Sequence, residues 1–430
     1  MIARYSRPQM AALWEADNKY RTWLSVEMAA CEAMAKAGVI PTSAPSEIAA
    51  RAVIDPARID ELERQSQHDV AAFVTAVSER VGPAGHYLHW GMTSSDLLDT
   101  ALALVIRQAS DLLMVDLAAL LATLKDKAEA HKATLMIGRS HGIHGEPVTF
   151  GWKMALWYEE TRRNLLRLRA AQAGIAFGKL SGAMGTYAHL SPDIEADYCA
   201  RLGLSPEPAS TQIIPRDRHA QYLQTLALIA ASIEKFSTEI RHLQRTEVGE
   251  VEEPFESGQK GSSSMPHKRN PIASENLCGL ARLLRANAAA ALENIALWHE
   301  RDISHSSVER VIFPDSTILL NYMLHRFTRM IRDLVVYPDR MAKNLNATGG
   351  AIYSQSVLLR LIEKGWSREA AYATVQAAAM AGFHSGGDFK AALLSQPNVV
   401  PAAVADCFDP ARYVARIDTI FERIFNAPEA

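Results

Sequence analysis

Two long stretches of helical periodicity constrain the fold of this chain more than any other feature. Apolar side chains recur every three to four residues over residues 217–246 and again over residues 271–299, the spacing that gives a helix one apolar stripe. At about 1.5 Å per residue, each helix would be roughly 45 Å long. One small domain cannot cover such a stripe, so we expect a long helical bundle that packs against other copies of the chain.

The rest of the sequence agrees with an all-α protein of three helical domains. The chain has 430 residues, 48% of them hydrophobic, and is rich in the helix-favouring residues alanine and leucine. We expect an N-terminal helical domain over residues 1–110, a central long-helix bundle over residues 111–345 and a small helical domain over residues 346–430. Further helices are predicted over residues 8–38, 55–81, 111–132, 147–173 and 316–336.

Charge, hydropathy and cysteine spacing exclude several classes of protein. A net charge of −3 gives no overall attraction to nucleic acid or to an anionic membrane. The most apolar region, residues 97–124, is broken by three charged side chains, and the start of the chain lacks the apolar core of a signal peptide. The four cysteines form no CxxC pair, which fits a reducing compartment. We therefore expect a cytoplasmic protein that binds neither nucleic acid nor membranes.

The stretch over residues 250–271, EVEEPFESGQKGSSSMPHKRNP, lies between the two longest helical patterns. It holds three consecutive serines and Lys268, a mixture that a protein core has no use for. Asn270 and Pro271 are typical of an N-cap and a first helical residue, so the positive end of the next helix and its free N–H groups would point into the loop. A basic surface linker is the alternative, but linkers rarely carry a Met-Pro-X-Lys core beside a helix cap.

Residues 261–271, GSSSMPHKRNP, resemble the signature of the fumarase/aspartase superfamily of lyases, in the form found in its adenylosuccinate lyase branch. Residues 93–95 and 138–147 match the first and second signature blocks of this family, and the sequence after residue 352 is similar to its C-terminal domain. The resemblance therefore covers nearly the whole chain. It implies a homotetramer whose active sites are shared between subunits, and it implies no metal and no organic cofactor.

The resemblance also implies which side chains carry out the reaction. Removing a carbon-bound proton beside a carboxylate develops a second negative charge on that carboxylate, so the site needs fixed positive groups. In the family, Ser262 would be the base, acting as an alkoxide, and His141 would be the acid that protonates the leaving amino group. Lys268 would stabilise the developing charge. Glu275 would orient His141, and His68 would assist.

Some of these residues also have ordinary structural explanations. A single histidine on a helix, such as His68, is more often structural than catalytic. Ser94 or Ser95 could simply cap the next helix. The pair His141 and His144 could suggest a metal, but the neighbouring glycines and the missing third ligand argue against zinc. The glycine-rich residues that follow the predicted helix 147–173 lack the context of a phosphate loop, so we expect a connector there.

Substrate contacts are implied for residues in several separate segments. The run RDISHSSVER over residues 301–310 could, from spacing alone, be a phosphate-binding corner or a salt-bridged surface. Its match to the family's phosphate site decides for binding. The family often has a basic residue where this chain has Gln67. The implied substrate-binding residues are Arg4, Tyr5, Gln67, Asp69, Thr93, Ser94, Gln212, Ser263, Met265, Asn270, Arg301, Ser306 and Arg310.

The function that these resemblances imply is an anti elimination of fumarate. The expected substrates are adenylosuccinate, which would leave AMP, and the related succinyl-aminoimidazole-carboxamide ribotide of purine synthesis. Arg4 and the run over residues 301–310 favour a phosphorylated substrate. The alternatives within the superfamily are 3-carboxymuconate cycloisomerase, argininosuccinate lyase and fumarase. A non-enzymatic helical scaffold is disfavoured because all the implied catalytic side chains are present in the sequence.

Overall fold

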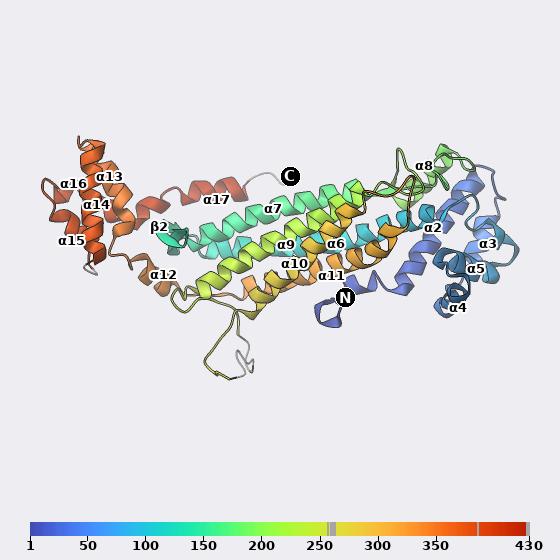
Figure 1. Cartoon of the computed structure of the whole chain (residues 1–430), viewed down its shortest axis with the longest axis horizontal. Coiled ribbons are helices and arrows are strands. Elements are labelled where there is room, and N and C mark those ends of the chain that lie inside the picture. The colour runs from blue at the N-terminus through green and yellow to red at the C-terminus, as the bar shows by residue number, and fades with distance from the viewer. Residues whose placement is uncertain (256–257, 259–263, 385–386, 427–430) are drawn as a thin grey trace. The chain divides into compact units, whose positions relative to one another are not determined.

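The computed structural model describes residues 1–255, 258, 264–384 and 387–426. The expectation of a helical protein is confirmed, because helices make up most of these residues and the strands form only three short pairs (Figure 1). Within the described residues, no helix combines the length and the apolar character that a membrane crossing requires. The chain divides into two compact units, each built from three stretches of sequence, and each unit is described by itself. The three-domain division stays a prediction.

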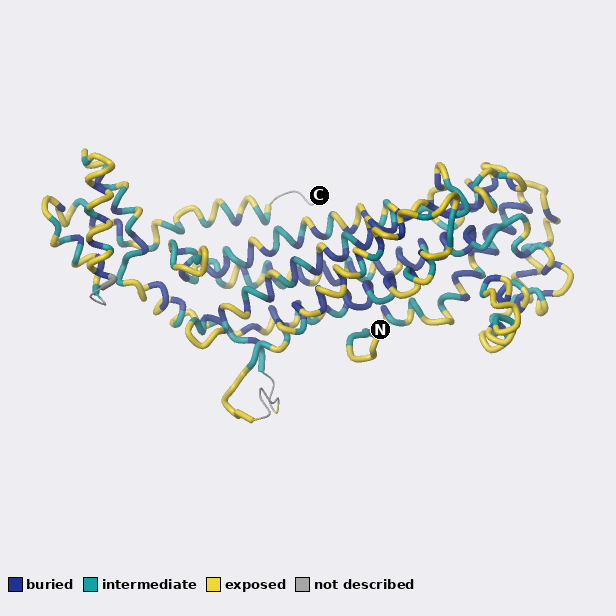
Figure 2. Tube along the Cα trace, in the orientation of Figure 1, coloured by how far each residue is buried: buried dark blue, intermediate teal, exposed yellow. Residues whose placement is uncertain are grey.

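Five long helices contribute residues to both units, and along each of them buried residues recur with helical spacing (Figure 2). The predicted helix over residues 217–246 is present, and the one over residues 271–299 is present but ends earlier. The prediction for residues 111–132 falls within a longer helix that starts in the first signature block. The five are α6 (Ser94–Ala130), α7 (Phe150–Ile175), α9 (Asp217–Gln244), α10 (Ile272–Glu293) and α11 (Ser304–Arg332).

Unit 1 comprises Met1–Ala118, Arg163–Glu234 and Leu277–Arg326. Its N-terminal core is aromatic, with the ring of Tyr20 stacked on Phe73 at 5.9 Å between centroids. The long helices are joined in pairs by buried polar contacts, such as the 2.9 Å hydrogen bond between the hydroxyls of Ser110 and Tyr222. Its shorter elements are η1 (Ala3–Tyr5), α1 (Pro8–Ala12), α2 (Ala16–Lys36), α3 (Ala44–Arg51), α4 (Pro56–Ser66), α5 (Asp69–Val81), η2 (Pro83–Tyr87), β3 (Phe177–Gly178), α8 (Pro192–Leu202) and β4 (Ser205–Pro206).

Unit 2 comprises Ala119–Arg162, Lys235–Asn276 and Phe327–Ala430. The rings of Trp157, Phe236 and Phe327 pack together and join α7, α9 and α11. Strands β1 (Leu135–Ser140) and β2 (Ile143–Thr149) form an antiparallel hairpin. The other elements are β5 (Val251–Glu252), β6 (Val335–Val336), α12 (Pro338–Leu345), η3 (Ala351–Tyr353), α13 (Ser354–Glu363), α14 (Arg368–His384), α15 (Phe389–Leu394), α16 (Pro401–Val404), η4 (Ala405–Phe408), η5 (Pro410–Val414) and α17 (Ile417–Phe425).

Two of the predicted helices are interrupted. The helix predicted over residues 8–38 is split into α1 and α2 at residues 13–15. The helix predicted over residues 55–81 is split into α4 and α5, because Gln67 adopts a left-handed conformation with φ 53° and ends α4. This second break places His68 at the start of α5, where a side chain can reach past the end of the helix.

Two predicted helix starts are wrong. Pro147 lies in β2, paired with Ile137 of β1, so α7 begins only at Phe150. The last long helix begins at Ser304 and contains Pro314, whereas its predicted start was residue 316. Most of the run over residues 301–310 is therefore the first two turns of α11, and Ser306 and Arg310 lie one turn apart on the same side of that helix.

Candidate active site

The first signature block forms the start of α6. The helix begins at Ser94, and the carboxylate of Asp96 accepts a hydrogen bond from the Thr93 backbone N–H at 2.8 Å. This is the return contact of a capping box, so the predicted cap at Ser94 or Ser95 is wrong and Thr93 is the residue that precedes the helix. The Ser94 hydroxyl oxygen lies 3.5 Å from His68 Nε2.

His68 has a fixed role in the backbone of unit 1. Its Nδ1 accepts a hydrogen bond from the Ala71 backbone N–H at 3.2 Å and thereby caps α5. An accepting Nδ1 carries no proton, so the neutral imidazole carries its proton on Nε2, the nitrogen that faces Ser94. Nδ1 of His68 thus has the structural role of capping α5, whereas the catalytic role predicted for His68 would use Nε2.

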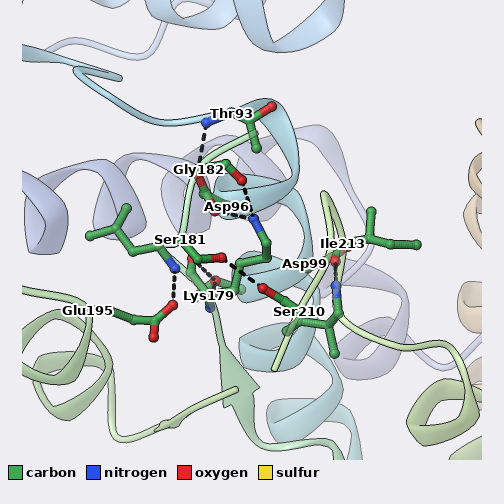
Figure 3. Close-up of polar contacts among 12 residues, drawn as sticks. Thr93, Asp96, Asp99, Lys179, Ser181, Gly182, Glu195, Ser210 and Ile213 are labelled. Carbon is green, nitrogen blue, oxygen red and sulfur yellow. Dashed lines mark hydrogen bonds and ion pairs between the residues drawn. The ribbon is translucent and has the colours of Figure 1, made fainter. Parts of the chain in front are cut away.

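The glycine-rich segment after α7 is a connector, as predicted, and it buttresses the start of α6 (Figure 3). Lys179 is fully buried, and its Nζ lies 2.5 Å from Asp96 Oδ1 and 3.0 Å from the Gly182 carbonyl oxygen. Burial raises the pKa of Asp96, although the charge of Lys179 opposes that effect. The sequence offered one signal for this contact, a lysine within an otherwise apolar and glycine-rich run.

The same connector also reaches the segment that carries Gln212. The hydroxyls of Ser181 and Ser210 lie 2.8 Å apart (Figure 3). Gly185 has a φ of +76°, and a Cβ on it would meet the Ser210 carbonyl oxygen at 2.1 Å. Glycine is therefore required for this close approach of two backbones.

The predicted phosphate-binding residues meet in unit 1. Arg301 donates from Nη1 to Gln212 Oε1 at 3.0 Å. Arg310 donates from Nη2 to Asp69 Oδ2 at 2.7 Å and from Nε to Ser306 Oγ at 3.4 Å. Three predicted substrate-binding segments, which are far apart in the sequence, are therefore joined by two guanidinium groups.

A cavity of about 310 Å³ opens beside these arginines. Apolar side chains of α2, α6 and α11, together with Trp14, form part of its wall. The polar side chains that line it are Lys19, Thr22, Ser95, Asp99, Arg216, Arg301, His305, Ser306, Glu309 and Arg310. Arg301 Nε is buried and has no hydrogen-bond partner among the described residues. Two guanidinium groups, a hydroxyl and an unused buried donor suit a phosphate group.

The charged side chains around this cavity shift each other's pKa. Burial lowers the pKa of Lys19, and the neighbouring Arg310 adds to that shift. Burial alone would raise the pKa of Asp69, but the hydrogen bond and the charge of Arg310 outweigh it and lower the pKa. Asp69 therefore remains ionised and occupies one side of the Arg310 guanidinium.

Glu309, between Ser306 and Arg310, is buried against Arg216, and it supplies a prediction on stability. Burial, together with the negative charge of Asp99, raises the pKa of Glu309 to about 7 despite the charge of Arg216. The folded chain then binds this proton more tightly than the unfolded chain, so its stability decreases as the pH rises from about 5 to about 7.

Between pH 5.5 and pH 7.5, the wild type should lose about 2 kcal/mol more of its free energy of unfolding than Glu309→Gln does. Urea unfolding of both proteins at the two pH values measures this difference. Parallel pH dependences in the two proteins would show that Glu309 does not release its proton in this range.

The second signature block lies in unit 2 as the β1–β2 hairpin. His141 and Gly142 form its tip with φ of 55° and 79°, the positive values of a type I′ turn. His141 is exposed there. Below the tip, Arg139 donates from Nη1 and Nη2 to the two carboxylate oxygens of buried Glu250 at 2.9 and 2.7 Å. The start of the stretch over residues 250–271 is thereby attached to the strand that presents His141.

His144 is the second histidine of this hairpin. It is partly buried, and both this burial and the charge of Arg139 lower its pKa. A neutral imidazole is the expected state at neutral pH. Among the described residues, no group of three side chains that could bind a metal is present.

The remaining predicted residues of unit 2 lie before and at the start of α10. Met265, Lys268 and Glu275 are exposed, and Asn270 is partly buried. Ser262 and Ser263 lie outside the described residues. Among the residues that the structure does describe, no hydrogen bond or ion pair joins His141 to Lys268 or Glu275. The acid–base roles of these side chains remain predictions.

The expectation of free N–H groups at the start of α10 is wrong for two of them. The carboxylate of Glu253 accepts hydrogen bonds from the backbone N–H groups of Ala273 and Ser274 at 2.9 and 2.8 Å. Glu253 lies about twenty residues earlier in the chain and caps these two N–H groups from outside the helix. These two N–H groups are therefore already used and are not available for a developing negative charge.

Two further predicted residues lie near the start of the chain, and a third ends α4. Arg4 and Tyr5 form the 3₁₀ turn η1, and the Tyr5 ring packs at 5.3 Å from the ring of Tyr322. The start of the chain is therefore folded, with Tyr5 packed against α11. Gln67 is exposed, and its amide donates to the Arg64 carbonyl oxygen at 2.9 Å.

Comparisons with known proteins support the signature blocks. The family model described as "Lyase" matches residues 3–284, and the one described as "Adenylosuccinate lyase C-terminus" matches residues 350–424. The adenylosuccinate lyase of Bacillus subtilis is 51% identical over 428 residues, which cover 99% of this chain and 99% of that protein. The adenylosuccinate lyase of a Synechocystis species is 53% identical over 429 residues, which cover 99% of this chain and 100% of that protein.

Solved structures agree with this fold. A fumarate lyase from a Mesorhizobium species superposes with a TM-score of 0.91 at 27% identity, covering 99% of this chain and 100% of that one. A 3-carboxy-cis,cis-muconate lactonizing enzyme from Pseudomonas putida superposes with a TM-score of 0.88 at 28% identity, covering 99% and 97%.

Proposed function

Because this chain belongs to the adenylosuccinate lyase family, we propose that it eliminates fumarate from adenylosuccinate to leave AMP, and from succinyl-aminoimidazole-carboxamide ribotide to leave the carboxamide ribotide. As a carbon–nitrogen lyase it acts in purine nucleotide synthesis. The observation that carries this proposal is the identity of 51% and 53% to two adenylosuccinate lyases over the whole length of both chains. The identity to the muconate lactonizing enzyme is only 28%, which leaves the cycloisomerase alternative with weaker support.

The nucleotide phosphate is proposed to bind at Arg301, Ser306 and Arg310. Their guanidinium and hydroxyl donors share one cavity, and the unpartnered Nε of Arg301 is a further donor for it among the described residues. Arg310 already pairs with Asp69, so a bound phosphate would share this guanidinium with that carboxylate. Lys19 adds a positive charge to the same cavity wall. Gln212, held by Arg301, would contact the substrate beside the phosphate.

The elimination itself is proposed to need one base and one acid. Ser262 would take the proton from the carbon next to the carboxylate, and Lys268 would stabilise the second negative charge that then develops. His141 would donate a proton to the leaving nitrogen, which suits an imidazole near neutral pH. Glu275 would orient His141 and favour its charged form. Neither a metal nor an organic cofactor takes part in these proposed steps.

His68 would serve as a hydrogen-bond donor in this reaction. Its Nδ1 is used by the backbone of α5, so only Nε2 can face a ligand, and in the neutral ring Nε2 carries the proton. A donor beside Ser94 suits a substrate carboxylate or the leaving group. Thr93 and Ser94 would bind the same carboxylate through their hydroxyls.

We also propose a homotetramer that shares its active sites between subunits and works in the cytoplasm. Large apolar side chains of unit 1 are exposed along α10 and α11, including Leu283, Leu292 and Val311. Contact with other copies would bury them. Sedimentation equilibrium of the purified chain tests this proposal, and a monomer mass at micromolar concentration would reject it.

The four buried free thiols fit a reducing compartment.

Replacing Arg310 by lysine tests the phosphate site. The variant keeps the positive charge but loses the planar fork, so KM for adenylosuccinate and the inhibition constant of AMP should both rise by about 10- to 100-fold, with a smaller change in kcat. Initial-rate measurements of fumarate release with and without AMP provide these constants.

Arg332→Lys is the matched control for this experiment. Arg332 ends the same helix and makes an exposed ion pair with Asp333 at 2.8 Å. The control should leave both constants unchanged. If KM for adenylosuccinate and the inhibition constant of AMP were the same in Arg310→Lys and the wild type, the phosphate would not bind at Arg310.

A further inference from the structure

Arg216, which immediately precedes α9, uses all of its N–H donors in contacts within unit 1. It is buried, with 2% of its side chain exposed. Two of its five N–H donors bond Asp99, at 2.8 and 2.7 Å, and one bonds the Ile214 carbonyl oxygen at 2.7 Å. The other two bond Glu309, at 3.1 and 3.3 Å. An arginine has five N–H donors, so none is left for a ligand.

The first partner of Arg216 lies one helical turn after the first signature block. Asp99 lies on α6 one turn after Ser95, and it is buried. Its Oδ2 also accepts a hydrogen bond from the Ile214 backbone N–H at 2.8 Å. Figure 3 shows the carboxylate of Asp99 facing the segment that contains Ile213. The start of α6, where Thr93 and Ser94 lie, is thereby fixed against residues 213–214.

The other two partners lie in or beside two further substrate-binding segments of unit 1. Ile214 lies two residues after Gln212, so the bond to its carbonyl oxygen holds the strand of chain that presents Gln212. Glu309 lies next to Arg310 on α11, and its carboxylate fixes the first turns of that helix. Arg301 donates a hydrogen bond directly to Gln212, so the segment before α11 is also connected to the segment that contains Gln212.

A buried ion pair of this kind is more rigid than a surface pair. The guanidinium is planar, so its five N–H directions are fixed relative to one another. The three segments that it contacts cannot move independently without breaking a buried, charge-assisted hydrogen bond. A lysine at this position would keep the charge but would have only three donors on one rotatable atom.

We infer that Arg216 is a positioning residue of the active site, which holds the Thr93–Ser94 block, Gln212 and the Arg301–Arg310 corner in one geometry through Asp99, Ile214 and Glu309. This inference rests on the proposed function, because these three segments matter together only if they bind one nucleotide substrate. Arg216 lines the same cavity as Arg301 and Arg310, but all five of its N–H donors bond protein acceptors. Its effect would appear in binding and in the alignment of the substrate.

The charges around Glu309 make this role dependent on pH. Glu309 faces Arg216, which lies just before α9, and Asp99, which lies on α6. His219 of α9 and His305 of α11 lie close to the same cluster. Burial and the charge of Arg216 lower the pKa of His219 to about 3 and that of His305 to about 4, so both rings are neutral above pH 6. Asp99 stays ionised there, because Arg216 outweighs the effect of burial and its pKa is lowered to about 2. Within this cluster, Glu309 is therefore the group that changes charge between pH 6 and pH 8.

The first test compares Arg216→Lys with Arg218→Lys in the full-length enzyme. Arg218 lies two residues further along and forms an ion pair with buried Glu207, with 2.8 Å between Nε and Oε2, but neither residue belongs to a substrate-binding segment. The inhibition constant of AMP, measured from fumarate release, should rise by about 10- to 100-fold in Arg216→Lys and by less than about twofold in Arg218→Lys. Equal inhibition constants in the two variants would overturn the inference.

The second test uses Glu309→Gln, which preserves the shape of the side chain and avoids an unpaired buried charge. At pH 6 the wild-type Glu309 is itself protonated, so the AMP inhibition constants of the variant and the wild type should agree within about twofold. At pH 8 the wild-type carboxylate is ionised and makes charge-assisted hydrogen bonds with Arg216, which the variant lacks. The AMP inhibition constant of the variant should therefore be about 5- to 10-fold higher than that of the wild type at this pH. A ratio that is the same at both pH values would overturn the inference, even if Arg216→Lys does not fold.

The wild type separates failure of this inference from failure of the proposed function. If the wild type releases no fumarate from adenylosuccinate, or if AMP does not compete, the proposed function itself fails. If the wild type behaves as proposed while Arg216→Lys and Glu309→Gln leave AMP binding unchanged, only the positioning role of Arg216 is rejected.

Discussion

Replacing Ser262 by alanine should reduce kcat for fumarate release by about 10³- to 10⁴-fold, because the reaction would lose its base. The same change should leave the affinity for AMP within about twofold of the wild type, since AMP makes no use of a base that acts on the succinyl carbon. Steady-state rates with adenylosuccinate and the inhibition constant of AMP measure the two effects. A variant with these properties would separate the chemical step from nucleotide binding.

Ser264→Ala is the matched control for this experiment. It makes the same change two residues away in the same run of serines, at a position without an implied catalytic role. Its kcat should stay within about threefold of the wild-type value, as is usual when no group in the chemical step is lost. Normal turnover by Ser262→Ala, or an equal loss in Ser264→Ala, would refute the assignment of Ser262 as the base.

Replacing His141 by glutamine should reduce kcat by about 10²- to 10⁴-fold, because glutamine cannot donate a proton to the leaving nitrogen. The hairpin should remain folded, since His141 is exposed at its tip and the strands below are held by Arg139 and Glu250. The pH profile provides a second measurement. The variant should lose the decline in kcat that deprotonation of the general acid causes in the wild type as the pH rises.

His144→Gln provides the control on the same hairpin. His144 lies three residues beyond His141, and its pKa is lowered by burial and by the charge of Arg139, so it is a poor proton donor near neutral pH. This variant should retain most of the wild-type kcat and the wild-type shape of the pH profile. If kcat decreased more in His144→Gln than in His141→Gln, His144 and not His141 would be the general acid.

The sequence predicted those parts of the fold that depend on regular periodicity. The recurrence of apolar residues every three to four positions predicts long amphipathic helices, and α9 and α10 lie in the two stretches where this pattern occurs. Helix ends were predicted less well, because they depend on contacts that no local pattern contains. The break at Gln67 and His68 has no proline or glycine to announce it, and Pro147 has the chemistry of a first helical residue although it pairs with Ile137 in a hairpin.

The candidate site shows the same division. The signature blocks and the arginine-rich run identified Arg301, Ser306, Arg310 and Gln212, which the structure brings together in unit 1. The supporting charges could not be found in this way. Arg216 is separated from Asp99 by 117 residues and from Glu309 by 93 residues, so only the folded chain reveals their contact.

The cap of α10 was missed for the same physical reason. Glu253 caps this helix from 20 residues away, and the local sequence pointed to Asn270 and Pro271 instead. An Asn-Pro pair satisfies the local preferences of a helix start, but it does not decide which acceptor takes the N–H groups once the chain folds back. A carboxylate that lies outside the helix, here just after β5, can replace a local cap, and no periodic pattern in the sequence predicts it.

One product measurement tests the central claim most directly. Purified wild-type protein incubated with adenylosuccinate should release AMP and fumarate in equal amounts, and added inorganic phosphate should slow this release competitively. Chromatography of the nucleotide, together with the ultraviolet absorbance of fumarate, quantifies both products in one reaction. Intact adenylosuccinate after prolonged incubation of folded protein, or AMP formed without an equal amount of fumarate, would contradict the account.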